Sequence, residues 1–194
     1  MIKFLMTAAS AALFSVAAQA GDHFYIQANA GSPSSDMNPC VDGAGNPATC
    51  SIQGQGAKLL AGYKVTPNFA LEATYWKLGK DHGLTQAGDQ YDGKVSAYGI
   101  GGALHFDITD AWAGVARFGF ARVRTKASAL YAGDPAWTAL GTESHAKYYA
   151  GGGLSYAITP TFRLNGDFDY TKVRSEAFQE HGMRLLSLGG SLHF

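Results

Sequence analysis

Six charged residues lie in stretches of the sequence that are otherwise apolar, and each has an apolar or aromatic residue or a glycine on both sides. In a strand, successive side chains point to opposite faces, so these charges would share the face opposite to their apolar neighbours. Charges that leave water are costly unless they are paired. We therefore predict an internal network of ion pairs, formed by Lys58, Glu72, Arg117, Arg163, Asp167 and Asp169.

The expected depths of these residues give two pairings. Glu72 would pair with Arg117 or Lys58, and Arg163 would pair with one of the two aspartates. Such a network has two possible uses: a gate that rearranges to let small solutes pass, or a permanent polar plug. We expect the plug, because the interior of a small barrel is only wide enough for side chains to fill it.

A catalytic relay is the other chemistry that the sequence offers. Glu143, Ser144 and His145 supply the residue types of a nucleophilic site. Three consecutive residues on a strand cannot form a relay, because their side chains alternate between faces. His105 and His193 lie at the opposite ends of their segments from His145, so they cannot complete a site with it. We predict no catalytic residue, no cofactor and no metal site, and hence no enzyme.

Three similar segments show how these side chains would be positioned. Each has two alternating runs joined by a turn, at Thr66–Asn68, Thr109–Ala111 and Thr159–Thr161. Pro, Asp and Asn at such positions are typical of tight turns, so we predict three hairpins. Polar stretches near 33–53, 80–93, 125–144 and 174–182 predict long loops. Strands are then expected near 22–32, 54–65, 68–79, 94–108, 111–124, 145–158, 161–173 and 183–194.

The two faces of these strands differ in a way that indicates a membrane. One parity is almost wholly apolar, and its aromatic residues gather near the strand ends, as at Tyr63, Phe106 and Trp112. This is the pattern of a barrel whose outer face meets lipid and whose inner face is polar. Unpaired strand edges are too costly in lipid, so the first strand must pair with the last. The predicted fold is all-β: a closed eight-stranded antiparallel transmembrane β-barrel.

The ends of the chain agree with export. Residues 1–20 have a positive start at Lys3, an apolar stretch and the small-x-small sequence Ala18–Ala20, which predict a cleaved signal peptide. Residues 21–194 would form one barrel domain. The chain has 15 Lys and Arg against 15 Asp and Glu, so no nucleic-acid partner is expected.

The last eight residues, SLGGSLHF, alternate up to a terminal aromatic residue. They read as a closing strand, and they resemble the carboxy-terminal signal by which outer-membrane barrels are recognised for insertion. The barrel-assembly machinery is therefore an expected partner. The residues that carry this signal are Ser187, Gly189, Leu192 and Phe194.

The segments GYKVTPNFALEATYWKLG and YAGGGLSYAITPTFRLNGDFDYTKV, with the closing SLGGSLHF, resemble the OmpA-like and opacity-type family of eight-stranded outer-membrane β-barrels. The resemblance implies a Gram-negative outer membrane, periplasmic termini, extracellular long loops and a monomer. It implies a surface protein that supports envelope integrity, or adhesion to a host or other surface through its loops. The alternatives are a narrow porin-like pore and a lipid-A-modifying enzyme.

Two further sites are predicted on this basis. Arg122, Arg124 and Arg184 share the lipid-facing parity near the loop ends, and arginine matches phosphate geometry, so contact with outer-membrane lipopolysaccharide is expected. The alternative is a solvated rim. Cys40 and Cys50 form an isolated pair in an exported chain, which predicts a disulfide in the first loop.

Overall fold

In a computed structural model, residues 23–36, 48–85, 88–133, 135–175 and 178–194 are described. The predicted signal peptide at 1–20 lies outside these residues, and so does Cys40 of the predicted Cys40–Cys50 disulfide. The described residues form an antiparallel sheet of nine strands. These are β1 (Phe24–Ser35), β2 (Ala48–Gln53), β3 (Gly56–Thr66), β4 (Phe69–Thr85), β5 (Gln90–Asp107), β6 (Trp112–Leu130), β7 (Thr138–Ala157), β8 (Phe162–Ser175) and β9 (Phe178–His193).

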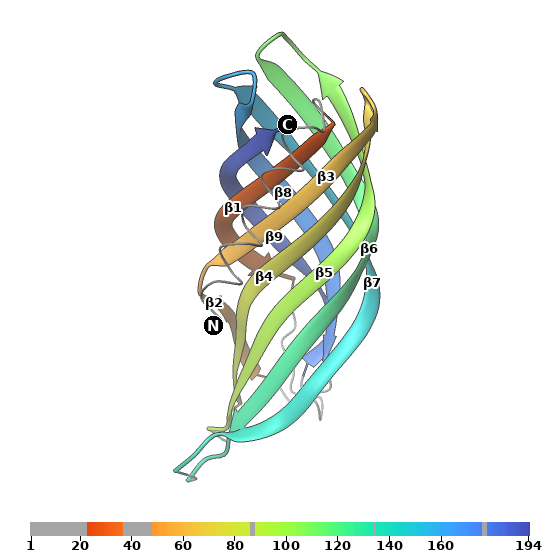
Figure 1. Ribbon diagram of the computed structural model, residues 1–194. Coiled ribbons are helices and arrows are strands. Elements are labelled where there is room, and N and C mark those ends of the chain that lie inside the picture. The colour runs from red at the N-terminus through yellow and green to blue at the C-terminus, as the bar shows by residue number, and fades with distance from the viewer. Residues whose placement is uncertain (1–22, 37–47, 86–87, 134, 176–177) are drawn as a thin grey trace, which may run out of the picture.

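The sheet closes on itself, with the first strand against the last (Figure 1). β1 pairs with β9 over eleven positions, with Ile26 opposite Leu192. β2 and β3 both pair with β4, one after the other, and Gly54, with φ +92°, interrupts the strand between them. Together they occupy one position in the wall, so the fold is a closed eight-stranded barrel, as predicted.

Burial in this barrel is the inverse of burial in a soluble one. Apolar side chains on the outside are highly exposed, with 72% exposure for Ile100 and 73% for Phe120. Lysine and aspartate on the inside are buried, with 1% exposure for Lys58 and 2% for Asp167. An apolar outer band and a polar interior are what a surrounding of lipid requires. The barrel is therefore a transmembrane one.

The described residues contain no helix long and apolar enough to cross a membrane.

The short turns at one end are built alike. In each, the threonine hydroxyl accepts a hydrogen bond from a backbone amide three residues later: Thr66 from Phe69, Thr109 from Trp112 and Thr159 from Phe162. These bonds stabilise the turn locally. The three predicted tight turns are confirmed.

The predicted strand ends at the other side of the barrel are wrong. β4 continues to Thr85 and β5 begins at Gln90, although 80–93 was expected to be a loop. Likewise β6 continues to Leu130 and β7 begins at Thr138. Beyond the lipid both faces of a strand meet water, so the alternating pattern is no longer required while the backbone ladder continues. As a result β4 to β7 form a wall that extends beyond the other strands (Figure 1).

Glycine and aromatic residues meet inside the barrel. Gly101 and Gly119 lie opposite each other on β5 and β6, and the ring of Tyr149 lies against both. A Cβ on Gly119 would lie 2.4 Å from the carbonyl oxygen of Ile100 and 2.7 Å from the Tyr149 ring. Such a ring fills the space that the missing side chains leave. The abundance of both residue types in the sequence has this packing as one cause.

Candidate functional site

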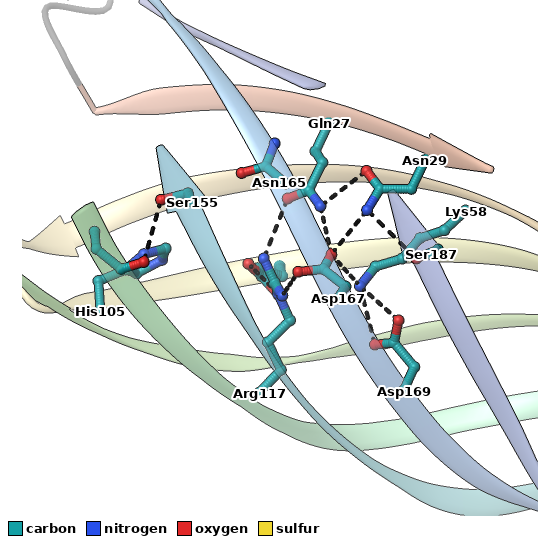
Figure 2. Close-up of polar contacts among 12 residues, drawn as sticks. Gln27, Asn29, Lys58, His105, Arg117, Ser155, Asn165, Asp167, Asp169 and Ser187 are labelled. Atoms are coloured by element: carbon teal, nitrogen blue, oxygen red, sulfur yellow. Dashed lines mark hydrogen bonds and ion pairs between the residues drawn. The ribbon is translucent and has the colours of Figure 1, made fainter. Parts of the chain in front are cut away.

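The centre of the lumen holds a cluster of buried charges from several strands. Lys58 of β3 donates to Asp167 of β8 at 3.0 Å and to Asp169 at 2.8 Å. Figure 2 shows the ammonium group lying between the two carboxylates. The side chain of Lys58 has no exposed area, so its charge is held by these two partners alone among the described side chains.

A second cation continues the cluster across the lumen. Arg117 of β6 donates from Nε to Glu72 of β4 at 3.0 Å and from Nη1 to Asp167 at 3.1 Å. Asp167 therefore bridges the arginine and the lysine (Figure 2). Each of the three carboxylates contacts a cation, which is the arrangement that makes buried charge tolerable.

Amide and hydroxyl groups complete the network. Arg117 donates from Nη2 to the Gln27 carbonyl at 3.1 Å, and Gln27 donates in turn to Asp167. Asn29 donates to Asp167 at 3.2 Å, and the Tyr25 hydroxyl donates to Glu72. Our sequence reasoning did not place Tyr25, Gln27 or Asn29 in the network. The signal that could have found them is their shared inward parity on the first strand.

The pairing predicted for Arg163 is wrong. Four residues along a strand span roughly 13 Å, so Arg163 and Asp167, both on β8, are too far apart to meet easily. The two aspartates are engaged by Lys58 and Arg117 instead. Arg163 and His105 line a cavity of about 330 Å³ at the short-turn end, and this cavity reaches Arg117 of the network.

The sequence reasoning assumed a lumen that is polar along its whole length, and this is wrong. On the long-strand side of the ion pairs, buried apolar side chains pack together inside the barrel. Each of them is at most 3% exposed, and the largest are Trp76, Leu78, Tyr149, Met183 and Leu185. A polar layer and an apolar layer thus follow each other along the axis.

The three arginines predicted at the rim do not form one site. Arg122 and Arg124 both point outward from β6 and are exposed, and Arg122 donates to the Ser144 hydroxyl at 3.1 Å. Arg184 lies on β9, separated from β6 by β7 and β8, and pairs with Asp36 at 2.8 Å.

A further carboxylate joins strands where β7 and β8 separate. Their ladder ends at Tyr149 opposite Thr171, and beyond it Glu180 of β9 accepts hydrogen bonds from Lys147 of β7 and Lys172 of β8. These bonds lower the pKa of the Glu180 carboxyl, with Lys147 as the larger contributor. The carboxylate therefore stays charged at neutral pH and ties the strands together.

The residues considered for a relay are divided between the two faces. His145 and Glu143 contact each other at 3.3 Å, while the Ser144 hydroxyl is engaged by Arg122 on the outer face. Within the part of the chain that the structure describes, no group of three or more His, Cys, Asp or Glu residues is arranged to hold a metal ion.

The four residues of the predicted insertion signal all lie in the closing region. Ser187 is buried beside Asn29, and Leu192 faces outward from β9. A Cβ on Gly189 would lie 2.0 Å from the Ala28 carbonyl oxygen, so glycine allows β9 to approach β1 here. Phe194 is joined to Phe24 by two backbone hydrogen bonds, of 3.2 and 2.8 Å.

The model of a known family, the outer membrane protein beta-barrel domain, matches residues 6–194. The chain belongs to this outer-membrane β-barrel family. The match covers the whole described barrel and therefore places the protein in an outer membrane. A search of curated proteins finds no match.

Solved structures give the same fold. Neisserial surface protein A (NspA) is 19% identical with a TM-score of 0.54, covering 88% of this chain and 97% of that one. The N-terminal barrel of Pseudomonas aeruginosa OprF is 13% identical with a TM-score of 0.52, covering 89% and 98%. The outer-membrane protein AlkL is 16% identical with a TM-score of 0.54, covering 89% and 90%. At these identities the likeness concerns the fold alone.

Proposed function

We propose that this member of the family is a non-catalytic surface barrel of a Gram-negative outer membrane, with a closed lumen and with contact surfaces on its long strands. The observation that carries the proposal is the network around Asp167. Side chains from β1, β3, β4, β6 and β8 meet there across the lumen, and an apolar layer lies directly beyond. We infer that the two layers together close the lumen.

The orientation in this proposal puts the short turns and both ends of the barrel in the periplasm. The extended wall of β4 to β7 then lies outside the cell. Its furthest part, where β6 and β7 end, presents large apolar side chains to water, namely Tyr131, Trp137 and Leu140. Exposed aromatic residues at a protruding tip are typical of contact surfaces. We place adhesion to another surface there.

The closed lumen is tested by conductance. The mature barrel would be refolded into a planar bilayer, with folding confirmed separately, and recorded beside Glu72→Ala. We expect a silent wild type, because paired side chains cross the lumen. Well-resolved openings of the wild type, made more frequent by Glu72→Ala, would contradict the proposal and support the narrow pore.

The contact surface is tested at the tip. Cells that display the barrel would be bound to wells coated with matrix proteins. We expect Tyr131→Ser with Trp137→Ser to reduce binding several-fold, whereas Ala136→Ser at the same tip leaves it unchanged. Equal binding by all three proteins would remove the tip from the proposal.

Insertion in this proposal uses the closing strand. Phe194 aligns with Phe24 at the short-turn end, where the assembly machinery would meet the last strand. We expect Phe194→Ser to lower the amount of folded barrel in the membrane. Unchanged insertion in cells would count against the signal.

A further inference from the structure

The outer face of β4, β5 and β6 carries cations in adjacent positions. Lys80, Lys94 and Lys126 lie directly opposite one another across the three strands. At the next outward-facing position toward the short-turn end, Lys77 and Arg124 lie on either side of Ser96 in the same way. All five cations are exposed on the outside of the wall.

Within the part of the chain that the structure describes, these charges lack a counter-charge. Among the described side chains, no carboxylate pairs with any of the five. The nearest acidic residue on the same outer face, Asp92, pairs with His82 instead, at 2.8 Å. Like charges directly opposite each other destabilise a sheet. On β8 and β9, by contrast, Lys172 pairs with Glu180 and Arg184 with Asp36.

The cations lie at the depth of lipid headgroups. Just below them, Tyr75 of β4 is opposite Tyr98 of β5, and both rings point outward and are exposed. Tyrosines on the outer face mark the interface between lipid and water. Tyr98, in the middle of β5, and Phe106, near its short-turn end, bound a segment of nine residues, which matches the roughly 9–11 residues of a tilted membrane-spanning strand. The cation rows are therefore level with the phosphates of the surrounding leaflet.

The same strands carry an apolar groove lower on the outer face. Its volume is about 690 Å³, and it extends over β3 to β6. Its lining combines small residues such as Ala61 and Ala73 with the larger side chains of Leu71, Ile100 and Phe120. A groove of this kind, below a cationic surface and within the lipid band, fits an acyl chain.

We propose that this face is a binding site for a doubly phosphorylated glycolipid of the outer leaflet, the lipid A part of lipopolysaccharide. The Lys80–Lys94–Lys126 row would hold one phosphate and the Lys77–Arg124 pair the other, with an acyl chain in the groove. Two cation rows favour a lipid with two phosphates over one with a single phosphate. The inference rests on the proposed orientation, with the long strands outside the cell.

The test measures binding of purified diphosphoryl lipid A to the refolded barrel in detergent micelles. Each cation near an anionic headgroup contributes roughly fivefold to affinity. We therefore expect Lys80→Ser/Lys94→Ser/Lys126→Ser to weaken binding more than tenfold, and Ala73→Phe to weaken it by obstructing the groove. The control, Lys172→Ser/Arg184→Ser, removes two outward cations that already have carboxylate partners, and should bind as the wild type does.

Three results would overturn the proposal: equal binding by the wild type and the triple variant, an equal loss in the control, or equal affinity for dephosphorylated lipid A. Equal affinity for phosphatidylglycerol would overturn the choice of a doubly phosphorylated ligand. All the substituted side chains are on the outer face, and heat-modified mobility on gels checks that each variant is folded. A wild type that binds lipid A but conducts ions would overturn the closed lumen and leave this site in place.

Discussion

The barrel has two concentrations of charge, and they differ in how the charge is balanced. In the lumen, Lys58 and Arg117 lie among three carboxylates, and every carboxylate contacts a cation. On the outer face of β4 to β6, five cations lie side by side without a carboxylate partner among the described side chains. The first cluster is buried and the second is exposed.

This difference indicates that the two charge clusters have different roles, one in stability and the other in binding. A buried charge has lost most of its hydration and needs a counter-charge within the protein. An exposed row of like charges remains hydrated and can take its counter-charge from its surroundings. We therefore assign the lumen cluster to holding the barrel closed, and the outer rows to binding an anionic lipid.

The largest expected change in stability comes from replacing a lysine by methionine in the lumen, compared with the same replacement on the outer face. Lys58→Met leaves Asp167 and Asp169 buried beside each other with one cation fewer. We expect the free energy of unfolding to fall by about 3–5 kcal/mol, the usual cost of breaking a buried pair. Urea unfolding of the refolded barrel in lipid vesicles measures it.

Lys94→Met is the matched control for this substitution. It removes an exposed lysine that has no carboxylate partner among the described side chains, so its effect on unfolding should stay within about 0.5 kcal/mol. Equal losses for the two variants would erase the distinction between the regions.

Backbone crowding should differ between the two faces as well. In Gly119→Ala the new methyl group would point into the lumen, against the Ile100 carbonyl and the Tyr149 ring. We expect a loss of about 1–3 kcal/mol in unfolding free energy. Gly152→Ala points outward, where the nearest atom is 3.4 Å away, and should cost much less. A larger loss for Gly152→Ala would show that the lumen is the looser side.

The smallest effect sharpens the account of the outer face. Asp36→Asn removes the carboxylate that pairs with Arg184. Because both side chains are exposed, stability should change by less than about 1 kcal/mol. The released cation lies on β9, on the other side of the barrel from the site on β4 to β6, so binding of diphosphoryl lipid A should be unchanged. A clear gain or loss of lipid binding would contradict the placement of the site on β4 to β6.

The sequence was sufficient for the parts of the fold that lipid constrains. Alternation located the strands within the membrane, and threonine and proline chemistry located the turns at Thr66, Thr109 and Thr159. The long strands beyond the membrane could not be predicted, because no lipid enforces a pattern there. The break at Gly54, which divides one wall position into β2 and β3, had no periodic signal either.

The site was predictable by face but not by partner. Parity placed Glu72, Arg117 and Asp167 inside the barrel, and the structure brings these three together. The partner of each charge depends on the stagger between strands, which the sequence does not specify. Arg163 was paired wrongly for a different reason, because it lies on the same strand as the two aspartates and too far along it to meet them. The outer cation rows depend on the same stagger: Lys80, Lys94 and Lys126 are far apart in sequence and become neighbours only through the ladder.

The most direct test of the central claim is a double-mutant cycle between Glu72 and Arg117. Unfolding free energies would be measured for Glu72→Gln, Arg117→Gln and the double variant in lipid vesicles. If the buried charges hold each other, each single variant leaves a partner uncompensated, and the double variant should lose at least about 1 kcal/mol less than the sum of the two. Additive losses would mean that the two charges do not stabilise each other, and would contradict the account.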